Sequence, residues 1–283
     1  MGAVGLRLLS VLPLLATTAA WAHAVDEAAD ASEAWLVGCL AISIAAYAIG
    51  VARLWRRAGR GHGIAAWRAA AFVGGWGVLV LALLSPLDRL GARLFSVHML
   101  QHELLMVVVA PLMVLGRPLA AWAWAMPLPW RRRVGSVFRH AAWRGPWRAL
   151  TAPLAAWVLH AAALWLWHVP PWFEAALADP VVHTLQHASF LATALLFWWS
   201  VLGPSGRAAQ GVALVALFTT LLHSSALGAL LSLSSSVWYA RYGLEDQQLG
   251  GLLMWVPGGL VYLGCALVLA GRWISGGLTT ADA

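Results

Sequence analysis

The sequence predicts an all-α fold, a polytopic transmembrane helical bundle of about seven spans. Of its 283 residues, 61% are hydrophobic and only 10% are charged, whereas about 25% are charged in an average soluble domain. The apolar residues are grouped in segments of roughly 20, the length that crosses the hydrocarbon core of a bilayer. We therefore expect an integral membrane protein.

The N-terminal 33 residues precede the first of these spans. Arg7, the apolar run 8–20 and the small residues around Trp21 are typical of a signal peptide over residues 1–24. The same residues can instead be retained as an extra N-terminal helix. Residues 25–33 are acidic, and we expect them on the periplasmic side.

The predicted transmembrane domain covers residues 34–272, and residues 273–283 form a cytoplasmic tail. Each span is an apolar stretch bounded by arginine, glycine, proline or polar residues. A long basic loop is expected between the third and fourth spans. The seven spans are 34–51, 67–84, 95–115, 153–169, 181–200, 211–231 and 250–270.

The charges indicate how the bundle is oriented. If the connections after the first and third spans lie on the same side, that side holds 14 of the 18 arginines, and the opposite side holds nine of the 11 acidic residues. Because basic residues concentrate on the cytoplasmic side, we expect the mature N-terminus outside and the C-terminus in the cytoplasm. The net charge of +7 then reflects topology, and it does not indicate nucleic-acid binding.

Two histidine pairs are the most informative local pattern. His98 and His102 lie on the third span, and His183 and His187 lie on the fifth. A spacing of four residues places both imidazoles of a pair on one helix face, and imidazole is the commonest metal ligand in proteins. All four histidines are expected in the outer third of the membrane, so the pattern predicts a metal site between two helices.

Further residues at a similar depth extend this candidate site. They are additional candidate ligands or supporting groups: His168, His223, Glu103, Asp246 and Met254. Whether His160 and His223 join the site depends on helix packing.

The ligand types favour copper, because the set combines imidazoles and thioethers without a thiolate. Zinc also accepts imidazoles, with Glu103 or Asp246 as an oxygen ligand, and facing histidines on two helices can ligate a haem. The cysteines, Cys39 and Cys265, are far apart in apolar segments, so neither a thiolate site nor a disulfide is expected. The sequence His102-Glu103-Leu104-Leu105-Met106 lacks the second histidine of the HExxH protease motif. No enzymatic function is expected.

Three stretches of the sequence resemble the multi-span cytochrome c oxidase assembly factors of the CtaG type. They are the segment 98–102 with Ala110-Pro111-Leu112 and Leu115-Gly116-Arg117-Pro118, the segment 167–170 with 183–190, and the segment 246–251 with Met254-Trp255 and Pro257. The resemblance covers about residues 67–270. It implies a seven-helix protein of the bacterial inner membrane that helps to mature a haem-copper oxidase.

Combining the resemblance with the histidine pattern predicts a protein that binds copper near the periplasmic face and passes it to an oxidase subunit. Its expected partners are cytochrome c oxidase subunits, a periplasmic copper chaperone and membrane lipid. Three alternatives remain open at this point. They are a haem-binding membrane cytochrome, a copper transporter, and a scaffold for oxidase subunits whose histidines only bridge helices.

Overall fold

The computed structural model describes residues 12–203 and 207–278, and this part of the chain is helical without any strand. The chain divides into two units, Met1–Ala45 and Ala46–Ala283. Helix α2 (Leu12–Ala58) supplies the described residues of the first unit and the start of the second. Of the predicted signal segment, residues 1–11 lie outside the described residues, and the remainder and the acidic segment belong to α2. Cleavage of this segment stays a prediction.

The seven predicted spans all correspond to helices. Six segments are long and apolar enough to cross a membrane: Ala34–Ala58 of α2, α3 (Ala66–Leu84), α5–η1–α6 (Phe95–Leu115), α12 (Pro180–Leu202), Ala208–Ser232 of α13 (Arg207–Ser232), and Leu244–Ser275, which contains α14 (Leu244–Leu253), η2 (Met254–Gly258) and most of α15 (Gly259–Leu278). The seventh, α10 (Pro153–His168), has 16 residues and qualifies together with α9 (Ala141–Leu150) as a bent pair. The all-helical, multi-span fold class is thereby confirmed.

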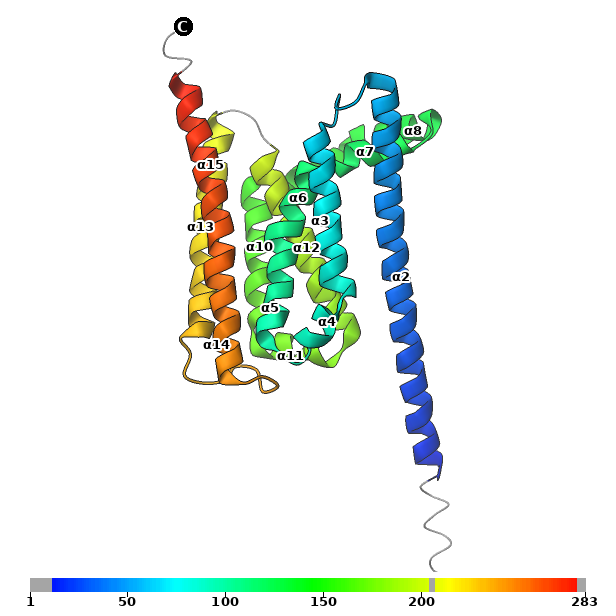
Figure 1. The fold of residues 1–283 in the computed structure, drawn as a ribbon, viewed down its shortest axis with the longest axis vertical. Coiled ribbons are helices and arrows are strands. Elements are labelled where there is room, and N and C mark those ends of the chain that lie inside the picture. Colours follow the sequence, from blue (N-terminus) through cyan, green and yellow to red (C-terminus); the bar gives the residue numbers. More distant parts are fainter. Residues whose placement is uncertain (1–11, 204–206, 279–283) are drawn as a thin grey trace, which may run out of the picture. The chain divides into compact units, whose positions relative to one another are not determined.

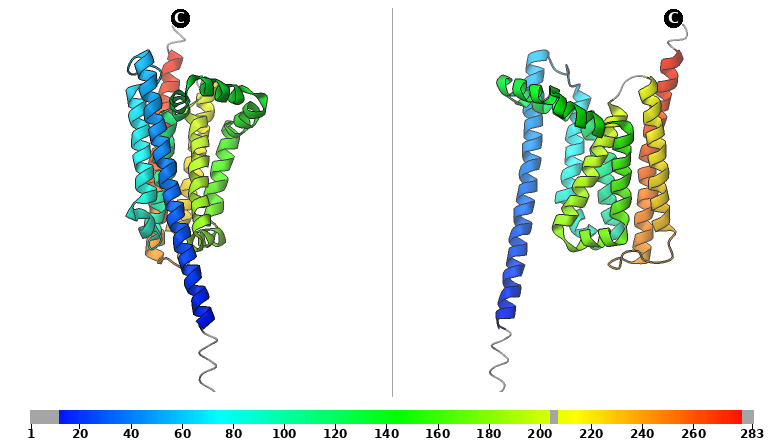
Figure 2. Two further views of the ribbon diagram at one scale, coloured as in Figure 1. Left: turned by 90° about the vertical axis from the view of Figure 1, so that its right-hand side faces the viewer. Right: turned by 180° about the vertical axis from the view of Figure 1, so that it is seen from behind.

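Short helices occupy both ends of the second unit. Helices α4 (Pro86–Gly91) and α11 (Pro170–Ala178) lie at one end, and α7 (Pro118–Ala125), α8 (Leu128–Arg139) and α9 lie at the other (Figures 1 and 2). The expectation of a basic loop between the third and fourth spans was therefore wrong. Apolar residues recur there with a helical period, and this period stabilises helices despite the many arginines.

Two of the spans contain a π-helical turn, η1 (Leu104–Val109) and η2. Pro111 is the second residue after η1, and Pro257 lies within η2. Proline has no N–H to donate to the carbonyl four residues earlier, so the regular hydrogen-bond ladder is interrupted at both places. π-Helical turns are frequent at functional sites, and η1 begins two residues after His102.

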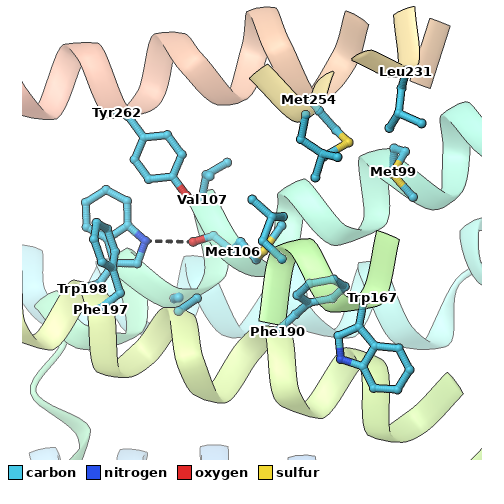
Figure 3. Close-up of a cluster of buried hydrophobic side chains, with 14 of the residues drawn as sticks. Met99, Met106, Val107, Trp167, Phe190, Phe197, Trp198, Leu231, Met254 and Tyr262 are labelled. Carbon is cyan, nitrogen blue, oxygen red and sulfur yellow. Dashed lines mark hydrogen bonds between the residues drawn. The ribbon is translucent and has the colours of Figure 1, made fainter. Parts of the chain in front are cut away.

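The packed interior joins α5, η1, α10, α12, α13 and α15. Figure 3 shows part of it, including Phe197, Trp198 and Tyr262. The indole Nε1 of Trp198 donates a 2.8 Å hydrogen bond to the carbonyl of Met106. Because that carbonyl belongs to η1, the side chain supplies a partner where the helical ladder is irregular.

Candidate metal centre

The two histidine pairs are carried by α5 (Phe95–Glu103) and α12, and both helices start from a carboxylate cap. Asp179 accepts hydrogen bonds from the N–H groups of Val181 and Val182, and Pro180 occupies the first turn of α12. The cap of α5 comes from a distant residue, Asp246, which accepts from the N–H groups of Phe95 and Ser96. Each pair thus lies in the first turns of a well-defined helix.

The structure brings the two pairs face to face. One candidate ligand nitrogen each of His98, His183 and His187 lies within 4.8 Å of the other two. The ring centroids of His98 and His183 are 5.4 Å apart, and those of His183 and His187 are 4.2 Å apart. Periodicity predicted each pair separately, and the tertiary structure shows that they converge.

His102 lies next to this triad and completes the group of four histidines. Its ring centroid lies 4.3 Å from that of His98 and 5.1 Å from that of His187. Phe190 packs against His102 at 4.6 Å, and Phe173 packs against His98 at 5.1 Å. The four imidazoles therefore form a compact group with aromatic rings packed against it.

Several buried nitrogens of these imidazoles lack hydrogen-bond partners. His98, His102 and His187 are 2%, 1% and 7% exposed, and His183 is half-buried. The buried nitrogens without a hydrogen-bond partner are Nε2 of His98, both nitrogens of His102, Nε2 of His183 and Nε2 of His187. Leaving a buried polar group unsatisfied costs about 1–3 kcal/mol, so a concentration of such groups points to a ligand that they share.

His168 lies beside the four histidines. Its Nδ1 is 2.6 Å from the carbonyl of Leu164, which leaves Nε2 facing the sulfur of Met99 at 3.4 Å. Its ring centroid is 6.4 Å from that of His102. The Tyr239 hydroxyl donates to the backbone carbonyl of His168, so this end of α10 is held in place.

The other candidate residues have different surroundings. Asp246 caps α5 with both carboxylate oxygens, and Met254 packs in the apolar interior near Met99 and Leu231 (Figure 3). Glu103 has an unpartnered buried oxygen, Oε2, and its carboxylate lies against Gly258 of η2.

His160 and His223 belong to a separate part of the interior. The nitrogens of His160 lie 3.4 Å from the Thr193 hydroxyl and 3.5 Å from the Tyr262 hydroxyl. His223 packs edge-on against Trp157 at 5.6 Å. We therefore leave both out of the ligand set.

Sequence reasoning missed three polar residues around the histidines. Asp88 of α4 lies close enough to His183 for an electrostatic interaction, and its Oδ1 accepts a 3.0 Å hydrogen bond from Gln101. Gln101 and Gln186 are both fully buried. The sequence contained a signal for the two glutamines, because a glutamine directly precedes the second histidine of each motif.

The donor set fits a metal ion. An ion held by nitrogens at about 2.0 Å brings them roughly 3.3–3.5 Å apart, so the triad of His98, His183 and His187 needs only small side-chain rotations. The aromatic rings packed on the imidazoles favour a small ion over a macrocycle such as haem. A neutral imidazole set without thiolate suits copper and also accepts zinc.

Fold and site together define a multi-pass, all-helical membrane protein with a buried histidine cluster at one end of its spans. The sequence profile of the cytochrome c oxidase caa3 assembly factors (Caa3_CtaG) matches residues 45–275. The chain belongs to this family, and the matched region contains every residue of the cluster.

Similar proteins are found in mycobacteria. The uncharacterized proteins Mb0105 of Mycobacterium bovis and MT0111 of Mycobacterium tuberculosis are each 27% identical to this chain over 256 residues. The uncharacterized protein ML1998 of Mycobacterium leprae is 24% identical over 259 residues. Each alignment covers 84% of this chain and 38% of the relative, so the chain spans well under half the length of these relatives. No solved structure matches the chain.

Proposed function

We propose that this chain binds copper through His98, His183 and His187, with His102 as a fourth ligand, and passes it to an oxidase subunit. Membership of the caa3 assembly-factor family supports a role in oxidase assembly. The copper role is carried by one observation, the convergence of four histidines that each have at least one buried nitrogen without a hydrogen-bond partner. Copper is the cargo in this proposal, so no catalytic residue is needed.

The position of the site suits transfer from the periplasmic side of the inner membrane. His183 is only half-buried and lies in the first turns of α12. His102, one helical turn along α5 from His98, is almost fully buried. A donor such as a periplasmic chaperone would meet His183 first, and ligand exchange would move the ion between imidazoles.

Metal analysis of the detergent-purified full chain tests the proposal. The variant His98→Ala/His187→Ala removes two ligands, and His62→Ala/His140→Ala is the matched control because both of its histidines are exposed. We expect copper in the wild type and in the control and none in the first variant, together with lower oxidase maturation in cells. An absorption spectrum is recorded on each sample.

Three results would overturn the copper assignment. Copper retained by His98→Ala/His187→Ala would place the ion elsewhere in the chain. A Soret band lost in the same variant would make the protein a membrane cytochrome. Absence of any metal from protein produced with ample copper would favour the scaffold alternative, in which the histidines only bridge α5 and α12.

A further inference from the structure

Two consecutive amphipathic helices, α8 and α9, join the third and fourth spans. The apolar residues of α8 recur with helical spacing at Trp130, Val134 and Val137–Phe138, and those of α9 recur at Trp143, Trp147 and Leu150. Such spacing places them on one stripe of each helix. The remaining surface carries six arginines and no acidic residue: Arg131, Arg132, Arg133, Arg139, Arg144 and Arg148.

The protein leaves these apolar stripes uncovered. Neither helix contains a buried residue, and Trp130, Phe138 and Trp143 are 60%, 59% and 50% exposed. One ring contact of the stripes lies within the pair, between Phe138 and Trp143, and another joins Trp147, 40% exposed, to Trp199 of α12. Large exposed aromatic residues arranged in a stripe indicate an interaction surface.

Helices α8 and α9 lie at the end of the spans, where the surface of the membrane is expected. Helix α9 is bent by 60° from α10, so it cannot continue along the direction in which α10 crosses the membrane. Helices α7, α8 and α9 lie together at the end of the second unit opposite to α4 and α11 (Figure 2). An element in this position can place its aromatic stripe in the interface while its arginines meet the lipid headgroups.

We propose that α8 and α9 form an interfacial binding surface for anionic phospholipids. Guanidinium groups bind phosphate through paired hydrogen bonds, and tryptophan prefers the headgroup level of a bilayer. The guanidinium of Arg131 lies 4.1 Å from the ring centre of Trp124, and that of Arg133 lies 5.9 Å from the ring centre of Trp130. Cationic and aromatic groups are thus presented together, and six arginines without a nearby acid match a negatively charged surface. This inference does not depend on the copper proposal.

Lipid selectivity of the reconstituted full chain tests the charge part of the proposal. Spin-labelled phosphatidylglycerol and phosphatidylcholine are compared by electron paramagnetic resonance in phosphatidylcholine bilayers. We expect the wild type to bind phosphatidylglycerol severalfold more strongly and Arg131→Gln/Arg132→Gln/Arg133→Gln to lose most of this preference. The control Arg89→Gln/Arg93→Gln, which removes exposed arginines at the opposite end, should keep it. Equal preference in all three proteins, or none in the wild type, would overturn the proposal.

A second measurement keeps every arginine and does not depend on how the triple variant folds. A nitroxide is attached at Phe138→Cys, or at Ser136→Cys on the arginine-bearing side of α8, in a chain with Cys39→Ser and Cys265→Ser. With α8 at the interface, the label at position 138 should collide with lipid-soluble oxygen, and the label at position 136 should collide with a water-soluble nickel chelate. A label at position 138 that collides with the nickel chelate as often as that at position 136 would show that the stripe faces water or a soluble partner, and would overturn the proposal.

Discussion

The carboxylate of Asp246 accepts two hydrogen bonds from Ser96, one from its backbone N–H at 3.1 Å and one from its hydroxyl at 2.6 Å. The two residues are 150 positions apart in the chain. The start of α14 therefore holds the start of α5, the helix that carries His98 and His102. Asp246 supports the histidine cluster by fixing a helix end, and both of its carboxylate oxygens already accept hydrogen bonds.

Replacing Asp246 should lower stability without removing a metal ligand. Loss of a helix cap costs about 0.5–2 kcal/mol, so we expect Asp246→Ala to unfold at a lower temperature in detergent and still to bind copper. Glu245→Ala, the exposed neighbour, is the control and should leave the unfolding temperature unchanged. If Asp246→Ala lost copper while its unfolding temperature stayed at the wild-type value, Asp246 would be a ligand instead.

Copper should stabilise the folded chain, because a ligand that binds only the folded state shifts the unfolding equilibrium. The gain is about 2.7 kcal/mol at a free concentration one hundred times the dissociation constant. We expect the unfolding temperature of the wild type to rise with added copper and that of His98→Ala/His187→Ala to stay constant. An equal rise in both proteins would locate the binding outside the histidine cluster.

Asp88→Asn should weaken copper binding while leaving its stoichiometry unchanged. The Asp88 carboxylate lies close to His183 and accepts a hydrogen bond from Gln101. Groups that support metal ligands contribute about 10–100-fold in affinity, and we expect a loss in this range in a competition titration. Glu174→Gln, an exposed residue at the same end of the second unit, is the control, and equal affinity in both variants would remove Asp88 from the site.

Gly251→Ala should destabilise the contact between α13 and α14. A Cβ at this position would lie 2.6 Å from the carbonyl oxygen of Gly228 and 2.7 Å from the amide nitrogen of Ser232. Relieving such overpacking costs about 1–3 kcal/mol, which should appear as a lower unfolding temperature. At Gly264 nothing lies within 4 Å of an added Cβ, so Gly264→Ala should unfold at the wild-type temperature or above it. Equal behaviour of the two variants would contradict the close packing of α13 on α14.

Tyr239 and Tyr242 should make stability sensitive to alkaline pH. Both lie between α13 and α14, and their hydroxyls donate 2.8 Å hydrogen bonds to the carbonyls of His168 and Gly91. Burial raises the pKa of both phenols above the ordinary value of about 10. Their contribution is therefore complete below pH 10 and is lost as the pH rises through the higher folded-state pKa.

The double variant Tyr239→Phe/Tyr242→Phe separates this effect from general alkaline unfolding. It should be less stable than the wild type at neutral pH, because it lacks both hydrogen bonds, and its stability should fall less above pH 10. The measurement is the unfolding temperature as a function of pH. Parallel curves for the two proteins would show that these phenols do not govern the alkaline loss.

Much of the fold could be predicted because hydropathy and helix periodicity are local properties. The predicted span 95–115 coincides with α5–η1–α6, and the predicted span 67–84 lies within α3. Helices α8 and α9 depart from the predicted loop, because the apolar stripe of Trp130, Phe138 and Trp143 stabilises helices in a segment rich in arginine. The period of this stripe is also a local property, and it indicates helices where the arginine content alone indicates a loop.

The sequence by itself determined which segments are helical, which of them are apolar enough to cross a membrane, and that two of them carry a histidine pair on one face. Each of these properties depends on residues within a few turns of one another. The tertiary structure alone decided that the histidines of α5 and α12 face each other, that Asp246 caps α5, and that His160 and His223 lie apart from this histidine cluster. Those relationships join residues that are distant in the chain, and they are set by how helices pack, which the period of a single helix does not specify.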